Sequence, residues 1–190
     1  MAIPTESLDV RYSDPEAVAV HWSDAVSRLA KAELAWIVTV RPDGRPHATP
    51  MVPVLHDDKV YFHTGRSEVK YANLLADPNV LVLVGDTEWN HGLDVMFEGV
   101  ARVVSEASVL REVADLYLVR WDGRWKLEVD DGVSSVAAPD ADLVVLEISP
   151  RVVRAHAKGD PFGQTTYRFT DGTGEGAGQG AGIPEGEHES

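Results

Sequence analysis

The residues around position 68 have the types and spacing of an anion-binding site. Ser67 precedes the run Glu68–Ala76, which reads as a short helix, and serine is a favoured N-cap residue. The free N–H groups in the first turn of a helix attract an anion. Lys70 lies in that turn and Arg66 just before it, so two cations stand beside the same N–H groups. This pattern indicates a site able to hold a phosphate group, where a charge-assisted hydrogen bond contributes about 1.5–3 kcal/mol.

A local cluster of this kind is needed because the chain as a whole is acidic. Its 17 Lys and Arg face 31 Asp and Glu, which gives a formal net charge of −14. Proteins that bind nucleic acid through its phosphates need a basic face, so we expect no nucleic-acid partner. For the same reason we expect no anionic membrane surface as a partner. An anionic ligand has to be held by local cations against the overall field.

Other kinds of catalytic site find little support in the sequence. The absence of cysteine excludes disulfides, thiolate metal sites, iron–sulfur clusters and cysteine nucleophiles. The histidines do not pair at the close spacing of common metal motifs, so we expect no metal site. They are His21, His47, His56, His63, His91, His156 and His188. The glycine-rich phosphate loop, the serine nucleophile elbow and the zinc-protease motif are all missing.

The start of the chain lacks the features of a secretory signal. No basic segment followed by an apolar one is found there. The longest strictly apolar run is Val80–Val84, far short of the roughly 20 residues that span a bilayer. We therefore expect a cytoplasmic protein.

The elements that position the anion site read mostly as strands. A helix that begins at Asp14 or Ser23 and ends near Ala32 comes first. Three strands joined by tight turns follow, at 35–40, 46–55 and 60–64, and they form an antiparallel meander. Pro50 and Pro53 fall within the second strand and indicate an edge or a bulge.

The second half of the chain continues in the same style. After the helix at 68–76 we predict strands at 80–84, 93–104, 143–148 and 152–157, and a helix at 107–120. Gly99 is a candidate bulge in the long strand, and Ser149-Pro150 separates the two closing strands. The predicted fold class is mainly β (α+β), an antiparallel barrel of six to seven strands with about three peripheral helices.

The last twenty residues differ in composition from the rest. The segment 171–190 holds 7 of the 16 glycines, five acids and no Lys or Arg. Such a segment buries too little apolar surface to offset its ordering entropy, so we predict a disordered tail. The folded, cofactor-binding domain then covers residues 1–170.

Two motifs in this order resemble a known superfamily. TVRPDGRPHATP at 39–50 matches the pattern T-x-R-x-D-G-x-P-H-x-[TS]-P, and KYANLLADP at 70–78 matches K-x-x-N-L-x-x-[ND]-P. Both are similar to motifs of the split β-barrel superfamily of flavin- and deazaflavin-binding proteins, which includes pyridoxamine 5′-phosphate oxidases. The segments 92–99 and 159–169 are similar to an actinobacterial-type branch of that superfamily. The resemblance covers residues 22–170.

The resemblance implies which residues bind the coenzyme. Lys70 is the principal phosphate contact that it implies, and the strand at 47–49 would run along the ring. The implied cofactor-binding residues are His47, Ala48, Thr49, Thr64, Gly65, Arg66, Ser67, Lys70 and Asn73. For His47, contact with the coenzyme and a place on the barrel rim both stay open. Glu68 departs from the pattern, because deazaflavin-binding relatives often carry a second basic residue near that position.

The resemblance also implies a function. It is that of an oxidoreductase that transfers hydride between a bound coenzyme, FMN or the deazaflavin coenzyme F420, and a small conjugated organic substrate. The catalytic residue stays unknown, with His47 and His91 as candidates to donate a proton in place of solvent. The resemblance further implies a homodimer with the pocket at the subunit interface. The alternative is a non-catalytic split-barrel protein that binds a flavin, a haem or another tetrapyrrole.

Overall fold

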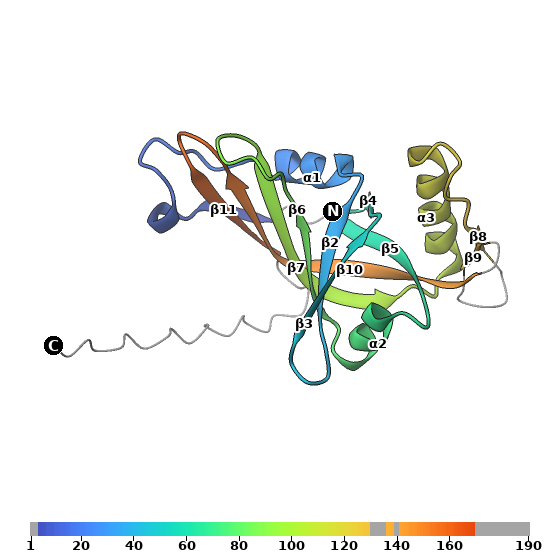
Figure 1. The fold of residues 1–190 in the computed structure, drawn as a ribbon. Coiled ribbons are helices and arrows are strands. Elements are labelled where there is room, and N and C mark those ends of the chain that lie inside the picture. Colours follow the sequence, from blue (N-terminus) through green and yellow to red (C-terminus); the bar gives the residue numbers. More distant parts are fainter. Residues whose placement is uncertain (1–3, 130–135, 139–140, 170–190) are drawn as a thin grey trace.

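The computed structural model describes residues 4–129, 136–138 and 141–169. Within them, eleven antiparallel strands form one curled sheet, with three α-helices on its outside (Figure 1). The predicted mainly β class is therefore confirmed, but the six to seven strands that were predicted are too few. The predicted tail lies outside the described residues. The helices are α1 (Trp22–Lys31), α2 (Val69–Ala76) and α3 (Ala107–Arg120), with a short 3-10 helix at Val10–Tyr12. The strands are β1 (Thr5–Leu8), β2 (Ala35–Val40), β3 (Pro46–Met51), β4 (Val54–His56), β5 (Lys59–Gly65), β6 (Asn79–Val84), β7 (Leu93–Val103), β8 (Glu128–Val129), β9 (Val136–Ala138), β10 (Ala141–Ala157) and β11 (Gly163–Arg168).

The long strand β10 is the centre of the sheet. On one side its first half pairs with β5 and its second half with β11. On the other side β9 pairs with 141–143 and β7 with 146–157. The prediction of two strands separated at Ser149-Pro150 is thus wrong. The chain absorbs Pro150, which has no N–H to donate, through a register shift between Pro150 and Val152.

The bulge predicted at Gly99 consequently lies on the facing strand. Gly99 pairs in regular register with Pro150 on one side and Val80 on the other. A Cβ atom on Gly99 would lie 2.4 Å from the Ser149 carbonyl oxygen. Glycine is required here because the backbone of β10 passes so close.

The predicted strand at 46–55 is two strands. β3 ends at Met51 and pairs with β2, whereas β4 begins at Val54 and pairs with β5. Pro53 falls in the break, where its missing N–H costs no ladder hydrogen bond.

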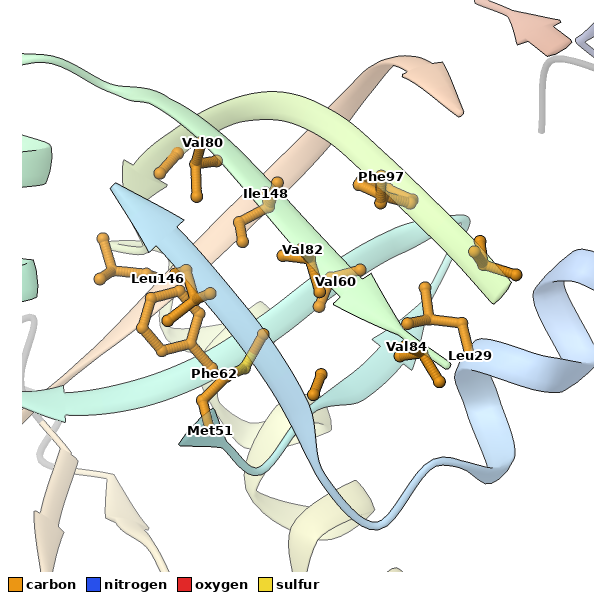
Figure 2. Packing of buried hydrophobic residues seen from close by; sticks show 14 of the residues in the cluster. Leu29, Met51, Val60, Phe62, Val80, Val82, Val84, Phe97, Leu146 and Ile148 are labelled. Atoms are coloured by element: carbon orange, nitrogen blue, oxygen red, sulfur yellow. The ribbon is translucent and has the colours of Figure 1, made fainter. Parts of the chain in front are cut away.

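The interior of the curled sheet is filled by branched and aromatic side chains. Figure 2 shows Val60, Phe62, Val82, Phe97 and Ile148 pointing toward one another from β5, β6, β7 and β10. Ala25 and Leu29 of α1 join this cluster and cover one end of the barrel. A second cluster lies between α3 and the strands β4, β5 and β10, around Tyr61, Leu110 and Tyr117.

The helices take up separate positions around the sheet. α1 lies at one end, and α2 lies near the β2–β3 hairpin at the other end (Figure 1). The loop 85–92 between β6 and β7 is at the α1 end, where Arg28 donates to Asp86 at 2.9 Å. None of the described helices has the length and apolar character needed to span a membrane. The cytoplasmic location stays a prediction.

Candidate functional site

The junction between β5 and α2, residues 65–70, is called the anion cradle below. α2 begins at Val69, and Glu68 rather than Ser67 occupies its N-cap position. The predicted N-cap role of Ser67 is therefore wrong. The Glu68 side chain turns back, and its Oε1 accepts a hydrogen bond from the Gly65 N–H at 2.9 Å. Through this contact the carboxylate fixes the entry of the chain into the helix.

The two cations of the anion cradle both have partners inside it or beside it. Lys70 is buried, with 8% of its surface exposed, and its Nζ forms an ion pair with Glu68 Oε2. Arg66 donates from Nη1 to the Tyr71 hydroxyl at 3.2 Å. Burial raises the pKa of Glu68, but hydrogen bonds from Lys70 and Gly65 outweigh it and hold that pKa below its ordinary value. Glu68 is therefore ionised at neutral pH.

Asn73 links α2 to the strand beneath it. Its side chain is 3% exposed, and its Nδ2 donates to Thr39 Oγ1 at 2.9 Å. Thr39 Oγ1 also lies 3.5 Å from His47 Nδ1. The amide is thus occupied within the protein, so Asn73 acts as a positioning residue for the site. Thr39 is not among the residues predicted for the site, although the alternation of burial along 35–40 indicates that it points inward, as Ile37 does.

The residues predicted on β3 divide between its two faces. His47 and Thr49 share the face that Thr39 and Ile37 of β2 also occupy, whereas Ala48 is exposed on the opposite face. The Thr49 hydroxyl is buried and has no hydrogen-bond partner among the described residues. A buried hydroxyl without a partner is costly, and it therefore marks a place where a ligand atom can bind.

The second histidine candidate lies far from the first. His91 is exposed in the loop 85–92, beyond the end of β2 that carries Ala35, whereas His47 pairs with Thr39 near the other end. Within one chain the two histidines therefore do not share a site. The loop of His91 borders a cavity of about 300 Å³ lined by Trp89, Asn90, Lys158, Gly159, Asp160 and Phe162.

The outer face of the sheet is hollowed and apolar. A groove of about 300 Å³ runs over β2, β6, β7 and β10 and is lined by Val38, Val40, Asn79, Val80, Leu81, Glu98, Gly99 and Arg151. We call this the outer groove. Trp36 follows on the same side of β2, paired with Pro50 and Leu83, and it is 51% exposed. Within the described residues no helix covers this indole.

Comparison with known proteins decides the family. The sequence profile of pyridoxamine 5′-phosphate oxidase matches residues 23–157. The chain belongs to the pyridoxamine 5′-phosphate oxidase family. The match includes the anion cradle, β3 and the whole of β10, and it ends before β11. The comparison with curated proteins finds no match.

Solved structures of this family share the split-barrel fold. A conserved hypothetical protein of Mycobacterium tuberculosis is 25% identical, with a TM-score of 0.60 over 77% of this chain and 89% of that one. A putative pyridoxamine 5′-phosphate oxidase of Listeria innocua is 20% identical, with a TM-score of 0.55 over 70% and 95%. A related FMN-binding protein of Nostoc punctiforme is 18% identical, with a TM-score of 0.53 over 78% and 88%. The split β-barrel expected from the sequence is thereby confirmed.

The residues of this chain fit a ring coenzyme of the kind found in the pyridoxamine 5′-phosphate oxidase family, with one departure. The partnerless Thr49 hydroxyl suits the polar edge of a ring, whereas the Ala48 side chain lies on the opposite face of β3 and does not reach the same place. Lys70 and the Gly65 N–H suit an anionic end, and Glu68 is the departure because it already engages both.

Proposed function

We propose that the chain is an oxidoreductase that binds FMN or the deazaflavin coenzyme F420 and transfers hydride to or from a small conjugated organic substrate. The observation that carries the proposal is the buried Lys70 at the anion cradle of a chain with a net charge of −14. Burying a lysine is costly unless an anion compensates it. Glu68 does so in the free chain, and the ammonium has three hydrogens, so it can also donate to a ligand. The family match supports the ring coenzyme.

The chain's own residues then have distinct roles. Lys70 donates to the anionic end of the coenzyme beside Glu68, and Thr49 hydrogen-bonds the polar edge of its ring. When bound, the coenzyme supplies the hydride chemistry. The core behind β3 excludes water from that side of the ring.

His47 is the proposed proton donor for reduction. The Thr39 hydroxyl accepts from Asn73, donates to the His47 carbonyl oxygen at 3.4 Å and lies 3.5 Å from His47 Nδ1. These contacts hold the side of the ring that carries Nδ1. Nε2, the other ring nitrogen, is then the atom from which a proton is given to the substrate.

We also propose that two copies of the chain form a homodimer through the outer groove and Trp36. An exposed apolar sheet face of this kind marks an interaction surface on a protein. The rim of the groove carries the ion pair Glu98–Arg154, a polar feature typical of interface edges. The partner subunit would then complete the ring pocket, that is, the place beside Thr49 and the anion cradle where the coenzyme ring would bind.

A coenzyme titration tests the function. The purified chain is titrated with FMN and, separately, with oxidised F420, and quenching of the ligand fluorescence is followed. We expect one of them to bind with a Kd on the order of micromolar. Lys70→Ala leaves the Glu68 carboxylate unpaired against the anionic end of the coenzyme, so it should weaken binding about tenfold or more. Lys126→Ala, whose side chain is 70% exposed, serves as the matched control and leaves Kd unchanged.

The same titration with haem separates the enzyme from the non-catalytic alternative. Binding of haem alone would contradict the proposal and favour a tetrapyrrole-binding protein. Binding of FMN or F420 followed by reduction of an acceptor above background would support it. Tight binding of FMN or F420 without reduction of any conjugated acceptor would favour a flavin-binding protein that is not an enzyme.

A further inference from the structure

The anion cradle already contains an anion, and that anion belongs to the chain itself. Glu68 Oε1 accepts from the Gly65 N–H at 2.9 Å, and Glu68 Oε2 is paired with Lys70. These are the donor and the cation that a ligand phosphate would use. The carboxylate is ionised at neutral pH, since the hydrogen bonds that it accepts lower its pKa. It therefore competes directly with a phosphate group.

The net positive charge of the anion cradle is therefore small. Lys70 and Arg66 contribute two positive charges and Glu68 removes one, which leaves a net charge of +1. Arg66 is in addition engaged by the Tyr71 hydroxyl. A phosphate dianion has either to displace the carboxylate from Lys70 or to lie beside it, and both cost electrostatic free energy.

A hydroxyl-rich chain meets no such conflict. Hydroxyl groups donate to a carboxylate and accept from an ammonium, so they can bind the Glu68–Lys70 pair as it stands. The buried Thr64 side chain, 1% exposed, lies beside Glu68, and hydrogen bonding from it helps to lower the pKa of that carboxyl. Thr64 is thus a neutral group that helps to hold the carboxylate in the anion cradle.

We propose that Glu68 is a specificity-determining residue that cancels most of the contribution of a ligand phosphate to binding. The inference rests on the proposed function, because it concerns the same coenzyme site. The ring and its hydroxyl chain then dominate recognition, and a flavin without phosphate binds about as well as one with it. Glu68→Gln retains an oxygen to accept from the Gly65 N–H, but it releases Lys70 to bind phosphate.

Parallel titrations with riboflavin and FMN test this inference. For the wild type we expect the two Kd values to agree within about threefold. In Glu68→Gln the Kd for FMN falls about tenfold or more, while the Kd for riboflavin changes less than about threefold. Glu16→Gln, which removes the same charge at an exposed residue before α1, leaves both values unchanged. Wild-type binding of FMN more than about tenfold tighter than riboflavin, or an unchanged ratio in Glu68→Gln, overturns the inference.

A second measurement keeps this test separate from that of the proposed function. Thermal unfolding is followed in inorganic phosphate and in chloride at equal ionic strength. We expect phosphate to raise the Tm of Glu68→Gln but not that of the wild type or of Glu16→Gln, since a ligand stabilises the folded state that binds it. If riboflavin, FMN and F420 all fail to bind, the proposed function falls, and this comparison alone decides on Glu68. Equal phosphate effects on all three proteins then refute its role.

Discussion

The Asn73 side chain joins α2 to β2 through one buried hydrogen bond, from its Nδ2 to Thr39 Oγ1 at 2.9 Å. Asn73→Ala removes the donor and leaves a buried hydroxyl short of a partner, so we expect the free energy of unfolding to fall by about 1–3 kcal/mol. Urea denaturation measures the change. As a control, Asn79→Ala removes an exposed amide that bonds only its neighbour Asp77, and it costs less than about 0.5 kcal/mol. Equal losses in the two variants would refute the structural role of Asn73.

The sequence allowed part of the site to be predicted at this scale. Gly65, Arg66 and Lys70 are close in the chain, so the geometry of one strand–helix junction brings them together. Thr39 could not be placed from the sequence, because its contact with Asn73 depends on where α2 packs on the sheet. Nor does a sequence show which carboxylate turns back onto a free N–H, and this is why Ser67 was mistaken for the N-cap in place of Glu68.

At the scale of elements, Glu147 connects three strands. It lies on β10, is 1% exposed, and accepts hydrogen bonds from Arg102 of β7 at 2.8 and 3.0 Å. From β5 it accepts from Lys59 at 3.0 Å and from the Tyr61 hydroxyl at 2.8 Å. Burial opposes ionisation of Glu147, but these donors outweigh it and lower its pKa to about 2. The carboxylate therefore holds together the strands that carry the site.

We expect Glu147→Gln to lower the free energy of unfolding by about 1.5–3 kcal/mol at neutral pH, because the partly exposed Lys59 and Arg102 lose the buried carboxylate that they share. The wild type should also lose about 3 kcal/mol as the pH falls from 4.5, the ordinary glutamate value, toward 2. The sign follows because only the unfolded chain takes up this proton over that range. Urea unfolding at several pH values should show a shallower acid loss in Glu147→Gln. Glu106→Gln, at the exposed second partner of Arg102, is the control; identical acid slopes in the wild type and Glu147→Gln would contradict the assignment.

Gly99 determines how closely β7 approaches β10. Gly99→Ala would place a Cβ 2.4 Å from the Ser149 carbonyl oxygen and 2.8 Å from Ile148 Cγ2. Because a backbone atom cannot move aside cheaply, we expect a loss of about 1–3 kcal/mol in the free energy of unfolding, measured in urea. Gly65→Ala, whose Cβ would meet its nearest atom only at 3.6 Å, is the matched control and should be nearly neutral. A neutral Gly99→Ala would show that the two strands can separate locally.

Most elements could be predicted from periodicity and turn residues, because these signals are local. The helix at 107–120 and the strand at 35–40 have the predicted bounds. The errors lie where proline is read as a break and tertiary pairing overrides it, as in β10 across Pro150. β1 was not predicted, because its pairing with β11 joins segments about 160 residues apart.

On the scale of the whole molecule, the sheet divides the residues that could do chemistry between two ends. The anion cradle and His47 lie toward the β2–β3 hairpin, and His91 and Trp89 lie in the loop at the α1 end. One chain alone therefore cannot use both ends for one ligand. The homodimer proposed above is the assembly through which a second chain could complete the pocket, and its contact face is the testable part.

Trp36 is the residue of that face whose change should be decisive, because a charge on a contacting apolar surface opposes burial. We expect the wild type to have twice the monomer mass in light scattering after size-exclusion chromatography, and Trp36→Glu to have the monomer mass. The matched control is Val119→Glu, which adds the same charge at an apolar residue of α3 that is 81% exposed, and it should leave the mass unchanged. Circular dichroism establishes that both variants are folded. If Trp36→Glu is folded and still dimeric, the dimer uses another face. If the wild type is monomeric, one chain alone builds the ring pocket.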